Sequence, residues 1–443
     1  MYFIGGTTTR LSKQRSNGKQ MSSPVTIAII GAGSRGNGYA RFAEQFPERL
    51  QIAAVADPDD FRRNRLGDRY DIPESRRFRT YQEFAAQPKM CDAVAICTQD
   101  SMHEGPAIAC AERGYHILLE KPMAPTADAC RRIVAAVKKA GVMFAVCHVL
   151  RYTSYTEAVR KVIKSGAIGE IMTIQHLEPL GYWHQAHSFV RGKWRNEAES
   201  SFMLLAKSCH DIDWLRGIMG KKCTRIQSFG TTRHFRASEK PAGAADRCVD
   251  CPEVVESFCP YSARKIYFRD RFCKGMDLWP VNVLTPIVTK ESLDEALKTG
   301  PYGRCVYACD NDVVDNQVVN MIFEDGSTAQ MLMTGFNFHG SRHTRIFGSL
   351  GELETDGRFV KVRRFLDDSE KVIDTETAND GGILTGHGGG DFGLMDNFVR
   401  ALAENDPSLI LTGIDETLES HLMVFAAEES RRTGKVCDVR TAE

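Results

Sequence analysis

A glycine-rich hexapeptide near residue 30 is the first candidate for chemistry in this chain of 443 residues. Gly31, Gly33 and Gly36 have the spacing G-x-G-x-x-G, with Ser34 and Arg35 before the last glycine. The motif follows an apolar run typical of a strand and precedes a segment with helical spacing. In that context the glycines allow a tight turn and close backbone approach, and the helix N-terminus attracts a pyrophosphate. We therefore expect these five residues to bind a dinucleotide.

The acidic residue that should accompany such a motif is Asp57, at the end of the second apolar run. A carboxylate there accepts hydrogen bonds from the adenosine ribose and repels a 2′-phosphate, which favours NAD over NADP. Arg62 and Arg63 follow closely and keep NADP as an alternative.

Two later segments also follow apolar runs and are candidates for the same site. One runs from Thr98-Gln99 to His103, and the other is Glu120-Lys121-Pro122. Ligands of parallel sheets bind beyond the carboxyl ends of the strands. We therefore expect Thr98, Gln99, His103, Glu120 and Lys121 to contact the cofactor.

Aromatic and hydrogen-bonding residues are dense between positions 181 and 195. The flat faces of a sugar ring stack on aromatic side chains, and its hydroxyls need polar partners. This pattern predicts a carbohydrate pocket, and an aromatic loop packed between domains is the alternative. The pocket residues would be Trp183, His184, His187, Trp194 and Arg195.

A glycine-rich stretch at 386–391 contains His387 and ends at Asp391. It could close over a substrate, with His387 in contact and Asp391 capping the following helix, or it could be a plain linker.

Four of the 14 cysteines fall within a short segment, namely Cys248, Cys251, Cys259 and Cys273. Their thiolates could hold a structural zinc, and the proline after Cys259 also occurs in some iron–sulfur sites. A metal would explain how residues 241–280, which lack a regular pattern, become ordered; unligated thiols are the alternative. The other ten cysteines are scattered and predict a reducing, cytoplasmic compartment without disulfides.

The elements that must position these residues divide the chain in two. Apolar runs at 25–30, 50–56, 92–97, 116–119 and 143–147 alternate with helical patterns, which predicts a parallel α/β sheet for a Rossmann-type domain at 24–148. Residues 1–23 are expected to form a disordered tail, without the features of a signal peptide.

The second domain, expected at 149–443, has a different pattern. Helices are predicted at 155–165, 201–219, 391–403 and 415–432. Strands at 170–178, 317–323, 328–334, 344–348, 352–355 and 358–365 follow one another by turns, which predicts an open, mainly antiparallel sheet. Its exposed face would join subunits into a homodimer or homotetramer.

Composition narrows the classes of partner. The 57 basic and 57 acidic residues balance, so there is no basic excess for a nucleic-acid backbone. At 42% hydrophobic and 26% charged, the chain is an ordinary globular sequence, and no apolar run is long enough to span a membrane.

In order and type, five motifs resemble the Gfo/Idh/MocA (glucose–fructose oxidoreductase, inositol dehydrogenase, rhizopine catabolism) family over about residues 24–435. They are the glycine loop, Thr98 to His103, Glu120-Lys121-Pro122, Arg151-Tyr152 and 210–213 (HDID). The resemblance implies a Rossmann domain, an open-faced α/β domain, a nicotinamide bound between them and a sugar or cyclitol substrate.

The resemblance also implies catalytic roles. Hydride transfer from a sugar carbon needs a base for the hydroxyl proton and a donor that polarises the oxygen. We expect Lys121 to be the donor and His210 the base, with Arg151 contacting substrate. Many family dehydrogenases have an aspartate four residues before the histidine, but this chain has Ala206 and then Lys207. Lys207 therefore becomes a further substrate-site candidate, expected on one helix face with His210.

Three functions follow from these residues. The first is an NAD-dependent oxidoreductase acting on a sugar, glycoside or cyclitol hydroxyl. The alternative is a redox-neutral glycoside-cleaving enzyme that passes through a transient keto-sugar and keeps its NAD. The third is a non-catalytic NAD-binding regulator, against which the presence of Lys121 and His210 argues.

Overall fold

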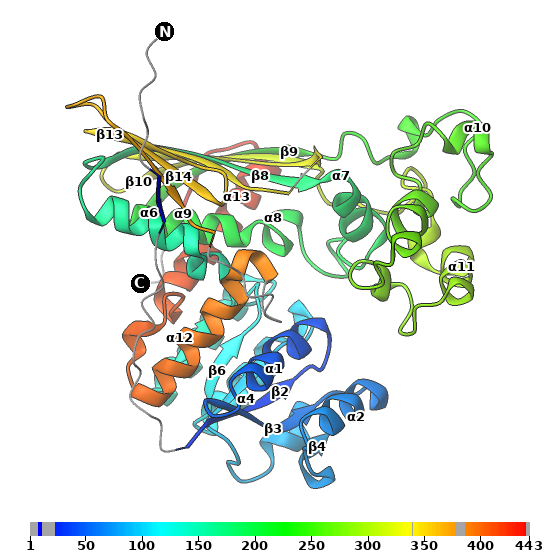
Figure 1. Cartoon of the computed structure of the whole chain (residues 1–443), viewed down its shortest axis with the longest axis horizontal. Coiled ribbons are helices and arrows are strands. Elements are labelled where there is room, and N and C mark those ends of the chain that lie inside the picture. The colour runs from blue at the N-terminus through cyan, green and yellow to red at the C-terminus, as the bar shows by residue number, and fades with distance from the viewer. Residues whose placement is uncertain (1–7, 11–22, 339, 377–385, 440–443) are drawn as a thin grey trace.

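The computed structural model describes residues 8–10, 23–338, 340–376 and 386–439. The N-terminal domain is built on a six-stranded sheet, in the lower part of Figure 1, and every pairing in it is parallel. This confirms the predicted Rossmann-type domain. In spatial order the strands are β4 (Arg77–Phe78), β3 (Leu50–Ala56), β2 (Val25–Ile30), β5 (Ala93–Ile96), β6 (His116–Leu119) and β7 (Phe144–Val146).

Helices of the N-terminal domain follow the strands in sequence. Helix α5 begins after Thr126, whose hydroxyl accepts from the amide of Ala129 at 3.2 Å, and ends at Gly141, in the left-handed region at φ 65°. The helices are α1 (Ser34–Gln45), α2 (Asp60–Arg69), α3 (Tyr81–Ala85), α4 (Glu104–Glu112) and α5 (Ala127–Ala140).

Helix α12 (Gly390–Glu404) also packs on this domain, although its sequence position places it in the second. Its buried Leu394, Met395, Phe398 and Val399 join the core around β2 and α1. A helix from late in the chain therefore completes the core of the N-terminal domain.

The second domain contains a ten-stranded, mainly antiparallel sheet, as predicted. The pairs β8–β11 and β1–β15 are parallel. In spatial order its strands are β1 (Thr8–Arg10), β15 (Glu370–Asp374), β14 (Phe359–Arg364), β13 (Gly351–Thr355), β12 (His343–Gly348), β8 (Ile171–Gly181), β11 (Thr328–Asn337), β10 (Asn316–Phe323), β9 (Cys223–Thr231) and β16 (Cys437–Asp438).

Strand β1 corrects the expectation that residues 1–23 are wholly without structure. Thr8–Arg10 pairs with β15 in parallel. The remainder of that expectation, at 1–7 and 11–22, lies outside the described residues.

Helices cover one face of the large sheet, and among the described residues no helix covers the other (Figure 1). The covering helices are α6 (Ser154–Lys164), α8 (Met203–Ala206), α9 (Cys209–Met219) and α13 (Ile414–Thr433). The predicted single helix at 201–219 is thus two helices, because the backbone leaves helical geometry at Ser208 (φ −96°, ψ 9°). Within the described part of the chain, no helix is long and apolar enough to cross a bilayer.

Residues 232–315, between β9 and β10, form a separate lobe on the right of Figure 1. The lobe has its own small core, which includes Phe235, Tyr261, Tyr267 and Leu293. It extends beyond the irregular segment expected at 241–280. Its elements are short: α10 (Glu253–Glu256), α11 (Lys290–Thr299), a π-helical turn η6 (Arg264–Arg269) and 3-10 turns η5 (Ala237–Glu239), η7 (Phe272–Lys274), η8 (Val281–Val283) and η9 (Pro301–Gly303).

Candidate nucleotide-binding and active site

The glycine loop between β2 and α1 is built for close backbone approach. Gly31 has φ +97°, and a Cβ there would lie 2.6 Å from the carbonyl oxygen of Cys97. A Cβ on Gly36 would lie 2.1 Å from the carbonyl oxygen of Gly31, so α1 packs directly on the loop. Gly33 has open space at that position, and the exposed Ser34 begins α1. The loop can therefore admit a phosphate at the helix N-terminus.

Asp57 ends β3 next to this loop. Its Oδ2 accepts from the amide of Ala32 at 2.7 Å and its Oδ1 from that of Asp59 at 2.9 Å. A carboxylate has about four acceptor positions, so ribose hydroxyls can still be bound. Arg63 donates to the backbone carbonyl of Asp57 at 2.8 Å and also pairs with Asp60. The Arg63 guanidinium is therefore already bound to the backbone of Asp57 and the side chain of Asp60.

Arg35 and Glu120, both expected to contact the cofactor, contact each other. Arg35 Nε lies 2.5 Å from Glu120 Oε1, and its Nη2 lies 2.7 Å from Asp391 Oδ1. Tyr39 donates to the same Glu120 oxygen at 2.7 Å. These contacts join α1, the end of β6 and α12, and the expected contact of Arg35 and Glu120 with the cofactor stays a prediction. Asp391 also does not cap α12, because Gly389 occupies the N-cap position.

The segment after β5 packs on the segment after β6. The Nδ1 of buried His103 lies 2.8 Å from the carbonyl oxygen of Pro122, and its Nε2 lies 3.3 Å from that of Thr98. His103 thus links the two loops, leaving the half-buried Thr98 and exposed Gln99 toward the strand ends.

Lys121 contacts the segment that leads to His210. Lys121 Nζ donates to the backbone carbonyl of Ala206 at 2.7 Å, and Ala206 ends α8, four residues before His210 on α9. His210 is 5% exposed, and its ring lies edge-on to that of His148, 5.5 Å between centroids. Position 206, where the resemblance would have placed an aspartate, therefore offers a backbone carbonyl to Lys121.

Two histidines that the sequence reasoning missed lie behind His210. Burial lowers the pKa of His148 to about 3, so its ring is neutral near pH 7. Neither of its ring nitrogens has a hydrogen-bond partner in the described chain. The ring of His421 is tilted against that of His148, with centroids 5.4 Å apart, and its Nε2 accepts from the amide of Met123 at 2.8 Å. His148 lies two residues after the end of β7, the same strand-end signal that selected Lys121, whereas His421 has no sequence signal.

Lys207 does not share a helix face with His210. It lies between α8 and α9, and its Nζ is 3.0 Å from Oε1 of buried Glu178 on β8. The other Glu178 oxygen lies 2.8 Å from Arg342, which also pairs with Asp211. The break in the helix therefore directs Lys207 into a buried ion-pair network against the sheet.

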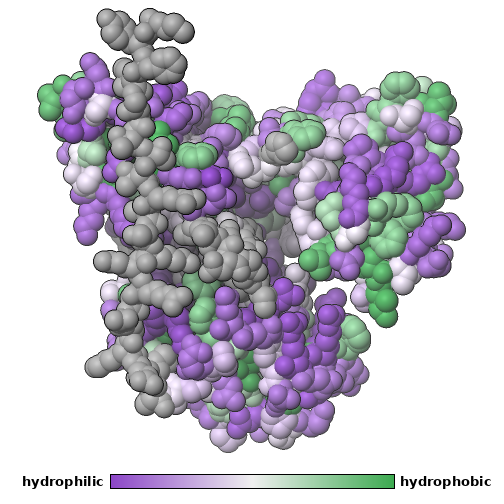
Figure 2. All heavy atoms as spheres, viewed as in Figure 1, coloured by the Kyte–Doolittle hydropathy of each residue, from purple (hydrophilic) through white to green (hydrophobic). Residues whose placement is uncertain are grey.

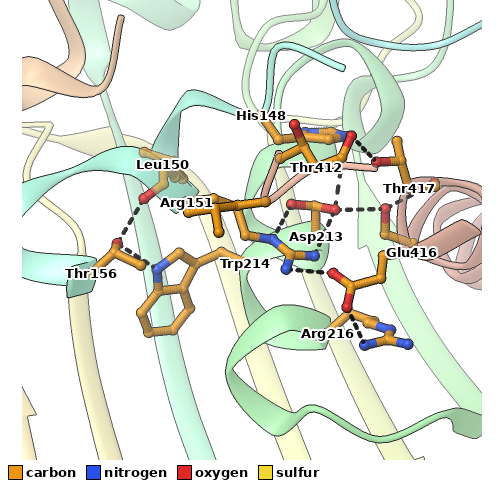
Figure 3. Close-up of polar contacts among 12 residues, drawn as sticks. His148, Leu150, Arg151, Thr156, Asp213, Trp214, Arg216, Thr412, Glu416 and Thr417 are labelled. Atoms are coloured by element: carbon orange, nitrogen blue, oxygen red, sulfur yellow. Dashed lines mark hydrogen bonds and ion pairs between the residues drawn. The ribbon is translucent and has the colours of Figure 1, made fainter. Parts of the chain in front are cut away.

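Arg151, predicted to contact substrate, belongs to a second buried network, shown in Figure 3. Its Nε lies 2.7 Å from Asp213, and its Nη1 lies 2.9 Å from Glu416 of α13. Asp213 also accepts from Ser420 at 2.9 Å and lies 4.0 Å from Nε2 of His148. The Arg151 guanidinium thus links α9 to α13 through its ion pairs with Asp213 and Glu416.

Part of the predicted aromatic segment packs against the lobe. Trp183 and His184, on α7 (Tyr182–His184), lie 5.4 and 4.9 Å from the ring of Trp279. The guanidinium of Arg271 lies 4.1 Å over the Trp183 ring. Sequence reasoning missed Trp279 and Arg271, since only the fold brings the lobe to this segment.

His187 lies deeper, on the π-helical turn η4 (Gln185–Arg191). It stacks on Tyr302 at 4.8 Å between centroids, and its Nδ1 lies 2.8 Å from Tyr267 Oη. Burial, with Arg191 and Arg271 nearby, lowers its pKa to about 3. His187 therefore joins the lobe to η4.

The remaining substrate candidates are dispersed. Trp194 packs beside Phe189 at 6.3 Å, and Arg195 pairs with Asp310 and Glu199 at the surface. His387 lies on the 3-10 turn η10 (Gly386–Gly389), and its side chain is outside the described atoms. Figure 2 shows the surface hollowed between the N-terminal domain and the lobe.

Three of the four predicted metal-binding cysteines surround one cavity in the lobe. Cys248, Cys251 and Cys259 line it together with Cys305, whereas Cys273 is exposed and is not part of its wall. Across the described ranges, no three His, Cys, Asp or Glu side chains are placed to share a single metal ion.

The comparisons with known proteins agree with this geometry. A model of the oxidoreductase family with an NAD-binding Rossmann fold matches residues 25–148, and a model of that family's C-terminal α/β domain matches residues 160–439. The chain belongs to the Gfo/Idh/MocA oxidoreductase family. The resemblance drawn from five motifs is thereby confirmed.

The alignments with curated relatives cover only part of this chain. The 2,7-anhydro-N-acetylneuraminate hydratase of Escherichia coli is 26% identical over 44% of this chain and 50% of its own length. Inositol 2-dehydrogenase 2 of Saccharopolyspora erythraea is 28% identical over 45% of this chain and 55% of its own length. The chain thus spans about half the length of these relatives.

Solved structures share the fold of this oxidoreductase family member over nearly its whole length. A levoglucosan dehydrogenase in complex with NADH and L-sorbose has a TM-score of 0.68 at 18% identity, covering 95% of this chain and 100% of its own. The aldose-aldose oxidoreductase of Caulobacter crescentus has a TM-score of 0.64 at 17% identity, covering 94% and 99%.

Proposed function

We propose that the protein is an NAD-dependent oxidoreductase that transfers a hydride between the cofactor and a hydroxyl-bearing carbon of a sugar, glycoside or cyclitol. The observation that carries this proposal is the hydrogen bond from Lys121, just beyond β6 of the nucleotide-binding sheet, to the carbonyl of Ala206, four residues before His210. A cation and an imidazole together meet the two needs of alcohol oxidation.

NAD, held by the glycine loop and Asp57, would supply the hydride acceptor for the substrate C–H bond. In the oxidation direction, His210 would accept the proton of the substrate hydroxyl. The Lys121 side chain would stabilise the negative charge that develops on the substrate oxygen. Asp57 supports NAD, and NADP is the weaker alternative because Arg63 is engaged with Asp57 and Asp60.

Two observations support this class of substrate: the aromatic side chains at 183–184 and 279, and the names of two relatives. Trp183 and Trp279 offer ring faces, and His184 offers a polar edge beside them. One relative is named an inositol 2-dehydrogenase and another a 2,7-anhydro-N-acetylneuraminate hydratase. Both names support a polyhydroxylated ring as the substrate.

A redox-neutral glycoside-cleaving enzyme is the second candidate. Ala206 leaves the histidine without the usual neighbouring carboxylate, and one relative is named a hydratase. Such an enzyme would oxidise a ring carbon, eliminate the leaving group, add water and return the hydride, so NAD would not turn over.

A panel of sugars, cyclitols and glycosides separates the two candidates. With NAD in excess, steady growth of reduced-nicotinamide absorbance supports the dehydrogenase. Release of aglycone with sub-stoichiometric cofactor, and no growth in absorbance, supports the redox-neutral enzyme. Binding of NAD without either outcome across the panel would favour the regulator.

We also propose an assembly through the uncovered face of the large sheet. Phe229, Val318, Leu332 and Leu177 form a row across β9, β10, β11 and β8, since each pairs with the next in register. A row of apolar residues on an open face supports a homodimer, or a tetramer built from dimers.

Two further proposals concern the cysteines. Their number and scatter support a reducing, cytoplasmic setting. The cysteines that line the lobe cavity support a structural metal centre, either zinc or iron–sulfur.

A further inference from the structure

Arg271, between the turns η6 and η7 of the lobe, has a guanidinium that two contacts hold in place. Its Nη1 donates to the carbonyl of Ile266 at 2.6 Å. The guanidinium also lies 4.1 Å over the ring centre of Trp183. Because the hydrogen bond and the ring fix its position and its plane, the side chain loses little further entropy when it binds a ligand.

The opposite edge of this guanidinium is open. Among the described residues, Nε and Nη2 of Arg271 make no hydrogen bond, and neither is one of the buried atoms that lack a partner, so both reach solvent. Elsewhere in the chain the same pair of nitrogens binds a carboxylate: Nε and Nη2 of Arg195 each lie 2.9 Å from an oxygen of Asp310. The open edge of Arg271 therefore has the geometry to bind a planar anionic group.

The charges around Arg271 leave it without an anion. Within the described parts of the chain, no carboxylate lies within ion-pair distance of it, and the neighbouring Asp270 is 2.7 Å from the ammonium of Lys265. Lys274 acts on that same carboxylate. Partial burial lowers the pKa of Arg271, because loss of water disfavours a cation. One carboxylate among these cations leaves a positive charge that an anionic ligand would neutralise.

This cation borders the aromatic group that is proposed to bind a sugar ring. Trp183 and Trp279 lie 5.4 Å apart between centroids, and His184 lies 4.9 Å from Trp279. Arg271 covers one face of Trp183, whereas Trp279 is 44% exposed. Since the guanidinium and Trp279 both contact the Trp183 ring, a sugar stacked on Trp279 has the open edge of Arg271 within reach of its substituents.

A second cation borders the same row of rings. Lys193 is exposed, and its ammonium lies 4.9 Å over the ring of Trp194. Phe189 lies 6.3 Å from Trp194 and 6.1 Å from His184, so the rings continue from Lys193 to Arg271. The surrounding protein lowers the pKa of Lys193 although the side chain is exposed, as expected in a recess of the surface. Positive charge at both ends of the row attracts an anionic ligand.

We propose that Arg271 binds an anionic group of the substrate, so that the chain acts on an acidic sugar, one that carries a carboxylate or a phosphate. The sugar ring stacks on Trp279, and the open edge of Arg271 receives two anionic oxygens. Trp183 is a positioning residue, since its ring holds the guanidinium. The inference rests on the proposed function for the reaction itself, but the binding step can be measured without hydride transfer.

Calorimetric titration of the full chain saturated with NADH tests the proposal, because the reduced cofactor accepts no hydride from a hydroxyl substrate. The probes are D-glucuronate and D-galacturonate beside D-glucose and D-galactose, with D-glucose 6-phosphate as the phosphate arm. We expect the acidic sugar of at least one pair to bind at least about tenfold more tightly than its neutral counterpart. A preference for a uronate assigns a carboxylate, and a preference for the sugar phosphate assigns a phosphate.

Variants assign that preference to the guanidinium. Arg271→Gln should remove it and leave the affinity for neutral sugars within about twofold of wild type. Arg271→Lys, which keeps the charge without the paired nitrogens, should retain part of it. Lys274→Gln is the matched control, because it removes the same charge from an exposed side chain of the same turn and should keep the preference.

Three outcomes would overturn the proposal. They are a panel in which no acidic sugar binds more tightly than its neutral counterpart, a loss of the preference in Lys274→Gln as complete as in Arg271→Gln, and NADH binding at least about tenfold weaker in Arg271→Gln, which would assign the anion to the cofactor. If Arg271→Gln does not fold, the wild type, Arg271→Lys and Lys274→Gln still decide.

The proposed reaction is tested separately from this binding step. If acidic sugars bind through Arg271 but none of the panel reduces NAD, the proposed oxidoreductase fails and the anion site holds. If the chain binds no NADH, the same titrations without cofactor still test Arg271. If neutral and acidic sugars are oxidised with equal kcat/KM in wild type and Arg271→Gln, the oxidoreductase holds and the anion site fails.

Discussion

The ammonium of Lys121 donates to the backbone carbonyl of Ala206 at 2.7 Å, so a catalytic candidate on the nucleotide-binding domain is held by the helix that precedes His210. This contact joins the two domains at the proposed point of hydride transfer. It also occupies the place where related dehydrogenases have a carboxylate.

Replacing Lys121 with methionine should lower kcat by about 10²–10³-fold, because the charge that stabilises the substrate oxygen is lost. NAD affinity, measured by calorimetry, should change less than about twofold. Lys207→Met is the matched control, because Lys207 pairs with Glu178 outside the proposed reaction. If kcat falls more in Lys207→Met than in Lys121→Met, Lys207 stabilises the substrate oxygen and the assignment of this role to Lys121 is wrong.

Asp57→Ala should weaken NAD binding by about 1.5–3 kcal/mol and narrow the preference for NAD over NADP. The variant removes the ribose acceptor and also leaves the amides of Ala32 and Asp59 without their present acceptor. Calorimetric titration of both cofactors, beside the surface variant Asp128→Ala, measures the effect. Unchanged NAD affinity in Asp57→Ala would contradict the assignment.

The stability of the protein should fall as the pH drops below about 6.5, in part through His187. Burial first, and then Arg191 and Arg271, lower its folded pKa to about 3, whereas the unfolded value is about 6.5. Between about pH 3 and pH 6.5, His187 is protonated in the unfolded chain but stays neutral in the folded chain. The contribution of His187 is therefore complete above pH 6.5 and about 2 kcal/mol smaller at pH 5.

Denaturant unfolding at pH 7 and pH 5 measures this dependence. His187→Phe keeps a ring against Tyr302 and should lose less stability between the two pH values than wild type. His343→Phe, at an exposed histidine, is the control and should behave as wild type. Equal pH dependence in His187→Phe and wild type would refute the prediction.

Leu332→Lys should convert the proposed dimer to monomers, because it places a charge in the middle of the row formed by Phe229, Val318, Leu332 and Leu177. Light scattering at micromolar concentration measures the mass. Phe258→Lys, at an 87% exposed side chain of the lobe, should leave the assembly intact. A wild-type protein with the mass of a single chain would exclude this interface.

Local sequence determined the nucleotide-binding half almost completely. The strand, the glycine spacing and Asp57 are close in the chain, and each follows from short-range rules of turn geometry and helix ends. The same rules placed Lys121, since a strand end in a parallel sheet points toward the ligand. The motif order was also enough to identify the family.

The tertiary structure decided which partners the charged residues of the predicted site have. Arg35, Glu120, Arg151 and Lys207 were predicted as binding groups, and in the fold each pairs with a residue distant in sequence. Burial of a charge requires such a partner, and its position depends on packing rather than on spacing.

The lobe shows the same division between sequence and fold. Four cysteines close in sequence were predicted as a cluster, and three of them, Cys248, Cys251 and Cys259, line the cavity. The fourth member of the cavity wall is Cys305, because backbone pairing across the base of the lobe brings it to Cys248, whereas Cys273 lies on an exposed turn. Spacing along a chain limits only neighbours, and contacts between residues dozens of positions apart are set by the closure of the fold.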